Sequence, residues 1–122
     1  MADSYRDLRV WKMGMDLVVR TYQLANRFPR KEVFGLANQL QRAAVSIPSN
    51  IAEGKGRSTD KEFLVFLHHA RGSLLEVETQ VLIARELGYI TAEDSEEYLG
   101  KAEILAKSLN ALIASLRAAR AA

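Results

Sequence analysis

Apolar residues recur at helical spacing in four stretches of the chain, separated by short polar or glycine-containing segments. Within each stretch they fall three or four positions apart, which places them on one side of a helix. No stretch alternates apolar and polar residues as a half-buried strand does. The pattern predicts an all-α protein with helices at about residues 7–28, 32–54, 60–87 and 92–118.

Residues at the ends of these stretches indicate where helices begin and end. Ser58 or Thr59 is expected to cap the third helix and Thr91 the fourth. Thr59 and Thr91 each have an acidic residue three positions later, as in a capping box. Gly54 and Gly56 are expected to end the second helix, and Gly88 the third. Glycine suits these positions because it takes the left-handed cap conformation without penalty.

The first helix shows how such a stretch is expected to pack. Its predicted core-facing seam consists of Leu8, Trp11, Met15, Val18, Tyr22 and Ala25. Gly14 lies inside this helix, where it costs about 1 kcal/mol relative to alanine, so we expect a close approach by a neighbouring element. Four seams joined by short turns predict one domain over residues 1–122, an antiparallel up-down-up-down four-helix bundle.

Pro48 interrupts the apolar period of the second helix. A proline inside a helix removes one hydrogen bond, clashes with the carbonyl of Ala44 and costs about 3 kcal/mol. Either a loop divides two helices here, or one helix is kinked. Ile51 keeps the helical phase of Ile47, whereas a loop would usually reset it, so we predict a continuous second helix kinked at Pro48.

The side of the second helix opposite its apolar seam carries an unusual set of polar residues. They are Gln39, Arg42, Ser46, Ser49, Asn50 and Glu53. Serine and asparagine are poor helix formers because their side chains compete for backbone hydrogen bonds. One interpretation is that they satisfy carbonyl groups freed at the kink. Another is a packed polar interface with Arg42 and Glu53 as ion-pair members, and a third is a ligand site.

The third helix has more apolar residues than its seam requires. Three leucines lie to one side of the seam: Leu64, Leu75 and Leu82. Gly72 lies nearly opposite the seam, on the outward side with Glu76. One interpretation is a broad apolar face with a tolerated glycine. We favour the other, in which a second subunit covers these residues, since large exposed apolar patches usually mark interaction sites.

Several motifs together resemble one known family. The segment RAAVSIPSNIAEGKGR is preceded by FPRKEVFGLANQLQ and followed by FLVFLHHARGSLLEVETQ, with LRVW near the start and ELGYI before the last helix. This pattern, over about residues 8–116, resembles the bacterial four-helix bundle family of 23S ribosomal RNA intervening-sequence proteins. The resemblance implies a ring-shaped homo-oligomer, a pentamer in members of known structure, and no established enzymatic activity. A similar fold is used by the accessory protein of diversity-generating retroelements, a basic ring that works with a reverse transcriptase and nucleic acid.

Composition and motif spacing give no catalytic, cofactor or metal site. The chain has no cysteine, which rules out disulfides, thiolate metal ligands and a cysteine nucleophile. His68 and His69 are adjacent and point about 100° apart on a helix, so they cannot chelate one metal as an i, i+4 pair would. Glu76 and Glu78 face different directions, which does not support a paired-carboxylate acid–base site. We therefore expect no enzyme activity, no cofactor and no small-molecule substrate.

The same sequence gives no sign of a membrane or of export. No apolar run approaches the roughly 18 residues of a membrane span. The polar, partly acidic N-terminus is unlike a signal peptide. We therefore expect a cytoplasmic protein without membrane contact.

Positive charge is concentrated in the first half of the chain. Residues 1–58 hold 10 Lys or Arg against 5 Asp or Glu, whereas residues 59–122 hold 7 against 10. In a ring, symmetry would repeat the basic surface in every subunit. The candidate contacts to RNA or DNA are Arg20, Arg27, Arg30, Lys31, Lys55 and Arg57. A solvated helix face is the simpler interpretation of these charges.

Two classes of function follow from these patterns. The first is a non-enzymatic, ring-forming structural or adaptor protein that docks a protein partner. Its candidate interface consists of Arg42, Ser46, Ser49, Asn50, Glu53, Leu64, Gly72, Leu75, Glu76 and Leu82. The second is weak, sequence-tolerant binding of RNA or DNA by the basic surfaces of the ring, which would weaken steeply with salt.

Overall fold

The computed structural model describes residues 4–121 and consists of helices joined by short turns. The four α-helices are α1 (Arg9–Ala25), α2 (Leu36–Lys55), α3 (Asp60–Glu86) and α4 (Ala92–Ala121). Two 3₁₀ turns, η1 (Tyr5–Asp7) and η2 (Arg30–Glu32), precede α1 and α2. The described residues contain no strand, so the all-α prediction is confirmed. Residues 1–3 and 122 of the predicted domain lie outside this part of the chain.

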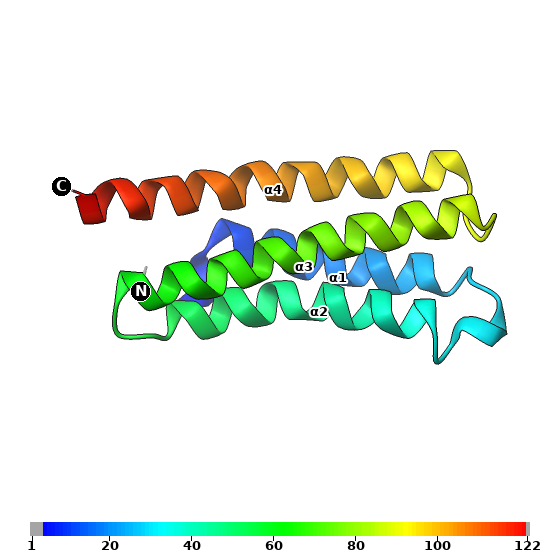
Figure 1. Ribbon diagram of the computed structural model, residues 1–122, viewed down its shortest axis with the longest axis horizontal. Coiled ribbons are helices and arrows are strands. Elements are labelled where there is room, and N and C mark those ends of the chain that lie inside the picture. The colour runs from blue at the N-terminus through cyan, green and yellow to red at the C-terminus, as the bar shows by residue number, and fades with distance from the viewer. Residues whose placement is uncertain (1–3, 122) are drawn as a thin grey trace.

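Consecutive helices run in opposite directions and lie side by side (Figure 1). Each helix packs against its neighbours in the order α1, α2, α3 and α4, and α4 closes the bundle against α1. The longest helix is α4, with 30 residues, drawn in orange and red in Figure 1. The predicted four-helix bundle is therefore confirmed.

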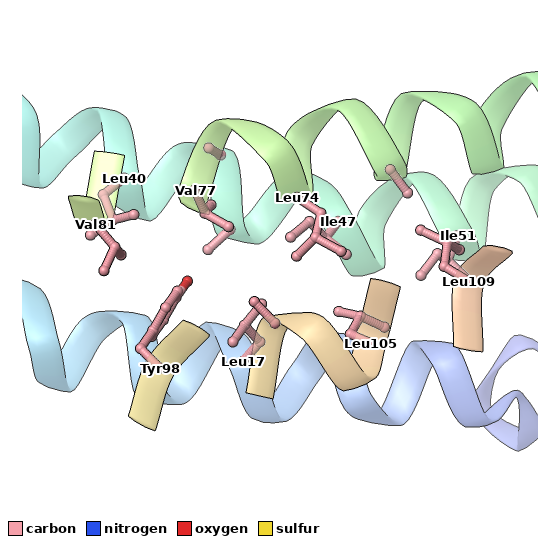
Figure 2. Close-up of a cluster of buried hydrophobic side chains, with 14 of the residues drawn as sticks. Leu17, Leu40, Ile47, Ile51, Leu74, Val77, Val81, Tyr98, Leu105 and Leu109 are labelled. Carbon is pink, nitrogen blue, oxygen red and sulfur yellow. The ribbon is translucent and has the colours of Figure 1, made fainter. Parts of the chain in front are cut away.

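Apolar side chains from all four helices fill the interior of the bundle (Figure 2). Leu17, Ile47 and Leu105 come from three different helices, and each is at most 2% exposed. Tyr98 is the largest fully buried side chain, and its hydroxyl group points into the interior. Full burial of one aliphatic side chain contributes about 1.5–3 kcal/mol, so the apolar seams are the main force that holds the helices together.

Helix α1 buries a different side from the predicted one. Its buried residues are Val10, Gly14, Leu17, Thr21, Leu24 and Ala25. Met15 and Tyr22 of the predicted seam are instead 41% and 44% exposed. The helix carries two stripes about 100° apart, and the buried one includes a glycine and a threonine. It therefore looks less apolar in the sequence than the stripe that faces outward.

Helix α2 is continuous through Pro48, as predicted. All residues from Leu36 to Lys55 are helical, which excludes a loop between two helices at this point. The Pro48 ring is buried and packs against α1. A Cβ atom added at Gly14 would lie 3.4 Å from Pro48 Cβ, an ordinary van der Waals distance to a side chain, so the structure does not show the close approach expected at this glycine. The kink itself stays a prediction.

The two glycines near the end of α2 do not form a left-handed cap, and this prediction is wrong. Gly54 is buried inside the helix, where a Cβ atom would lie only 2.5 Å from Phe66 Cβ of α3. Real Cβ atoms do not approach other atoms so closely, so Gly54 is a packing residue. Gly56 is the C-cap, but its φ of −78° is right-handed.

The caps predicted for the other two connections are confirmed. The hydroxyl of Thr59 accepts a hydrogen bond from the backbone N–H of Glu62 at 3.2 Å. The hydroxyl of Thr91 accepts one from the N–H of Asp94 at 3.0 Å. Gly88 follows α3 with a φ of 77°, a left-handed conformation that favours glycine.

The connection between α1 and α2 is longer than predicted. Helix α1 ends at Ala25, and α2 begins at Leu36. Glu32, expected in the first turn of α2, lies in η2 and caps the helix from there. Its Oε1 accepts a hydrogen bond from the Leu36 N–H at 2.9 Å, and its Oε2 accepts one from the Tyr89 hydroxyl at 2.7 Å. These two hydrogen bonds lower the pKa of the Glu32 carboxyl group.

Candidate interaction surfaces

Two of the polar residues around Pro48 form hydrogen bonds within the chain. Ser46 donates a hydrogen bond to the carbonyl three residues earlier at 2.8 Å, and it forms another with the Ser73 hydroxyl of α3. Asn50 Nδ2 donates to the carbonyl of Ser46 at 2.7 Å. Both side chains are half-buried and satisfy backbone groups near the proline. Neither of these bonds reaches the carbonyl of Ala44, which loses its usual donor because proline has no N–H.

The remaining candidates on this side of α2 are exposed. Ser49 and Arg42 are open to solvent, and Arg42 has no ion-pair partner among residues 4–121. Glu53 pairs with Arg57 at 3.0 Å, and both side chains are about half exposed. An exposed i, i+4 pair contributes only about 0.3–0.5 kcal/mol. Ser49 and Arg42 thus remain available to a partner.

An apolar groove runs along the outer side of α1 and α2. It has a volume of about 340 Å³ and is lined by Tyr5, Trp11, Met15, Val18, Val45, Pro48, Ser49 and Ala52. We call it the α1–α2 groove. Val19 and Tyr22 follow Met15 at helical spacing and are 59% and 44% exposed. The predicted α1 seam placed several of these side chains in the core, so this surface was not predicted.

The outer side of α3 carries a second exposed apolar surface, which we call the α3 surface. It consists of Val65, Leu75, Leu82 and Ile83, which are 37–60% exposed, around Gly72. A Cβ atom added at Gly72 would meet nothing within 4 Å. Packing within the chain therefore does not require a glycine at this position.

Two other predicted members of the α3 surface behave differently from each other. Glu76 is exposed, and its Oε2 accepts a hydrogen bond from Gln80 Nε2 at 3.1 Å. Leu64 is only 7% exposed and belongs to the core cluster of its own chain. The prediction that a partner covers Leu64 is therefore wrong, because the bundle already does so.

The α1–α2 groove and the α3 surface lie on opposite sides of the bundle. Arg71, one turn before Leu75, donates a hydrogen bond to Asn110 of α4. Leu75 and Leu82 share this side of α3 by helical spacing, so they border α4. The helices pack in the order α1, α2, α3 and α4, which sets the α1–α2 side opposite the α3–α4 side. One molecule thus presents two different apolar surfaces facing away from each other.

Three of the six basic residues predicted to contact nucleic acid are paired with carboxylates. Arg20 Nε of α1 lies 2.9 Å from Glu97 Oε1 of α4, and Arg27, in the turn after α1, pairs with Asp94 of α4. Arg57 is the partner of Glu53. Of the other three, Arg30 and Lys31 are exposed in η2, while Lys55 Nζ lies 5.9 Å from the centre of the Phe63 ring. The acidic fourth helix therefore neutralises part of the basic first half.

A basic cluster that sequence reasoning missed joins α3 to the last third of α4. His68 Nδ1 lies 3.1 Å from Arg71 Nη2, and His68 Nε2 lies 2.8 Å from Arg117 Nη2. Arg71 Nη1 donates to Asn110 Oδ1 at 3.3 Å. We call these four residues the His68 cluster. The i, i+3 spacing of His68 and Arg71 is visible in the sequence, but nothing there indicates that Arg117 lies beside them.

The surroundings of His68 hold its pKa below the usual 6.5. Burial disfavours the protonated ring most, and the charges of Arg71 and Arg117 add repulsion. The folded chain therefore binds fewer protons than the unfolded chain between the lowered pKa and 6.5. Stability contributed by this neutral ring is present above pH 6.5 and falls as the pH drops toward the lowered value.

The described residues form exposed apolar surfaces and bring cationic side chains together. Across residues 4–121, no group of three or more His, Asp or Glu side chains is placed to hold a metal ion. No helix within that range is long and apolar enough to cross a bilayer. The features that distinguish the molecule are its two apolar surfaces and the His68 cluster.

Comparison with known proteins assigns this four-helix bundle to a family. The profile of the 23S rRNA-intervening sequence proteins matches residues 6–111. The chain belongs to this family, as its motifs predicted. A protein of unknown function from Bacteroides thetaiotaomicron has a solved structure with the same fold. That protein belongs to the S23 ribosomal protein family. The two chains share 24% identity with a TM-score of 0.79, over 85% of this chain and 97% of that one. No curated protein matches the sequence.

Proposed function

We propose that this protein is a self-assembling structural or adaptor module, a homo-oligomeric ring built from four-helix bundles. The observation that carries the proposal is the pair of different apolar surfaces on opposite sides of one chain. A cyclic ring joins each subunit to the next through two unlike surfaces. The α1–α2 groove of one subunit would then receive the α3 surface of its neighbour. The subunit number of five follows from the family resemblance.

Several details of the two surfaces support this arrangement. Gly72 leaves the outer side of α3 flat, so another helix can approach its backbone closely. Pro48 and Ser49 form part of the groove wall, and Met15 and Val45 are 41% and 40% exposed there. Water contact at so many apolar side chains is unfavourable, and burial against a partner would recover about 25 cal/mol for each Å² covered.

Light scattering during size-exclusion chromatography tests the proposal. The native protein should elute as one species several times heavier than the 13.6 kDa chain at micromolar concentration. Met15→Lys in the groove and Ile83→Lys on the α3 surface should each reduce that mass without unfolding the bundle, because both residues are exposed in the single chain.

Ile104→Lys is the matched control for these two substitutions. Ile104 is 55% exposed on α4 and lies outside both surfaces, so its replacement should leave the assembly intact. A native mass of 13.6 kDa would contradict the proposal, as would equal damage from the control variant.

A second candidate function is weak binding of RNA or DNA by the ring. It is supported by Arg30 and Lys31, which are exposed in η2 without ion-pair partners among the described residues and would recur in every subunit. The pairing of Arg20 and Arg27 with α4 argues for a smaller contact area than the residue count suggests. Each phosphate contacted on duplex DNA should add about 0.9 to the salt slope of the affinity. An Arg30→Glu/Lys31→Glu variant should flatten that slope, and unchanged binding would exclude this surface.

A further inference from the structure

The His68 cluster contains more hydrogen-bond donors than its acceptors can satisfy. A guanidinium group only donates, and a neutral imidazole ring has one N–H and one acceptor nitrogen. Arg71 and Arg117 nevertheless contact the two ring nitrogens of His68, at 3.1 and 2.8 Å. In at least one of these contacts, therefore, an N–H group of the ring faces an N–H group of a guanidinium, and neither can accept a hydrogen bond. Asn110 accepts from the other terminal nitrogen of Arg71 and does not relieve this conflict.

The two positive charges of the cluster also lack a carboxylate. Among residues 4–121, the four ion pairs involve Arg20, Arg27, Arg57 and Lys107, and none includes Arg71 or Arg117. Arg71 is half-buried, while Arg117 is exposed, so solvent reaches one side of the cluster. A tetrahedral oxyanion would bring several acceptor oxygens and negative charge to the place where both are missing. Guanidinium groups suit such an anion because they offer paired N–H donors in a fixed plane.

We propose that the His68 cluster binds a phosphate group, with Arg71 and Arg117 as the charged donors and the His68 ring between them. The group belongs either to a free phosphate anion or to the backbone of a nucleic acid, since both present the same oxygens. All four residues come from one chain, so a single subunit contains the whole site. It also lies apart from the first-half basic residues considered above for nucleic-acid binding.

Phosphate binding at this site should depend on pH through His68. The charged or titratable groups that face His68 are Arg71 and His69 on α3 and Arg117 on α4. Lys55 at the end of α2 and Arg57 just after it lie over phenylalanine rings of α3 instead. A bound dianion offsets the repulsion from the arginines and favours a protonated ring. The affinity for an anion of fixed charge should therefore rise as the pH falls from 8 to 6.

Calorimetric titration of the native protein with sodium sulfate tests the site directly. Sulfate keeps its charge over this pH range, so a pH effect reports on the protein. We expect one saturable site per chain, and Arg71→Gln and Arg117→Gln should each weaken binding about tenfold or more, as the loss of a hydrogen bond to a charged group predicts. His68→Gln should remove the pH dependence. The two histidines of the chain make the His68 ring signal easy to assign by NMR in the same titration.

Arg120→Gln is the matched control, because it removes the same charge from the same helix. It should change the sulfate affinity by no more than about twofold, since exposed charges are screened. Absence of saturable sulfate binding, or an equal loss in the Arg120→Gln protein, would overturn the proposal. The Ile83→Lys variant separates this result from assembly, because its chains should still bind sulfate.

Competition identifies the source of the phosphate group. Inorganic phosphate should displace sulfate in either case. If a short single-stranded oligonucleotide also displaces it, and Arg117→Gln lowers the salt slope of oligonucleotide binding by about 0.7, the site takes a backbone phosphate. If the oligonucleotide does not compete, the site takes a small free anion. Sulfate binding without any displacement by phosphate would contradict phosphate recognition.

Discussion

The buried hydroxyl group of Tyr98 links α4 to α1 at the level of single residues. It lies 2.7 Å from Thr21 Oγ1, which in turn donates to the carbonyl of Leu17 at 2.6 Å. Because the threonine proton is used on that carbonyl, the tyrosine is the donor between the two hydroxyls. Burial raises the pKa of Tyr98 to about 12. The pair therefore stays fully protonated and hydrogen bonded at neutral pH.

Removing each hydroxyl in turn should show which one donates the hydrogen bond. Tyr98→Phe should lower the free energy of unfolding by about 1 kcal/mol, because Thr21 keeps its bond to Leu17. Thr21→Val should cost about 1–3 kcal/mol, because it leaves the Tyr98 hydroxyl buried without an acceptor. Urea denaturation of the two variants measures both values. A larger loss for Tyr98→Phe than for Thr21→Val would contradict the direction assigned to this bond.

At the level of elements, the contact between α2 and α3 depends on the missing side chain of Gly54. A Cβ atom there would lie 2.5 Å from Phe66 Cβ and 3.0 Å from Phe63 Cδ1. Phe66 Cβ is fixed to the backbone of α3, so the two helices would have to separate. Gly54→Ala should therefore destabilise the fold by about 1–3 kcal/mol, as overpacking does.

Gly100 of α4 provides the control for that prediction. It is exposed, and a Cβ atom there would meet nothing within 4 Å. Gly100→Ala should stabilise the protein by up to about 1 kcal/mol through helix propensity alone. Thermal unfolding of the two variants should thus give changes of opposite sign. A Gly54→Ala protein as stable as the native one would show that α2 and α3 can separate without cost.

Sequence patterns predicted elements better than they predicted which side of each element is buried. Thr59, Thr91 and Gly88 act locally, so the ends of α3 and the start of α4 were predictable. The buried stripe of α1 was not, because Gly14 and Thr21 lower its apolar character below that of the exposed stripe. Capping by a residue in a separate turn also hid the true start of α2.

At the level of the whole molecule, the contacts that matter join distant parts of the chain. The pairs Arg20–Glu97 and Arg27–Asp94 connect residues 77 and 67 positions apart and join acidic residues of α4 to basic residues of α1 and the turn after it. Counting charge by halves could not show this neutralisation. The His68 cluster could not be predicted for the same reason, because His68 and Arg117 lie 49 positions apart in the sequence. Periodicity places a residue on a side of its own helix, but it does not align that helix with another.

Only the proposed assembly of several chains explains both groups of exposed apolar residues. The α3 surface was predicted in part from Gly72, Leu75 and Leu82. The α1–α2 groove became visible only when the bundle showed which stripe of α1 faces outward. Two unlike surfaces suit head-to-tail contacts, which form a ring when the rotation between neighbours closes, whereas a single self-complementary surface suits a two-fold dimer.

Mixing the Met15→Lys and Ile83→Lys proteins tests the central claim of ring assembly most directly. Each variant keeps one intact surface, and both carry lysine at the altered one, so the altered surfaces cannot attract each other. Each protein alone should be a 13.6 kDa monomer by light scattering, and the equimolar mixture should form a two-chain species. In it, the α3 surface of the Met15→Lys chain occupies the groove of the Ile83→Lys chain. A homodimer of either variant alone, or a mixture that stays monomeric, would contradict a ring built from two unlike surfaces.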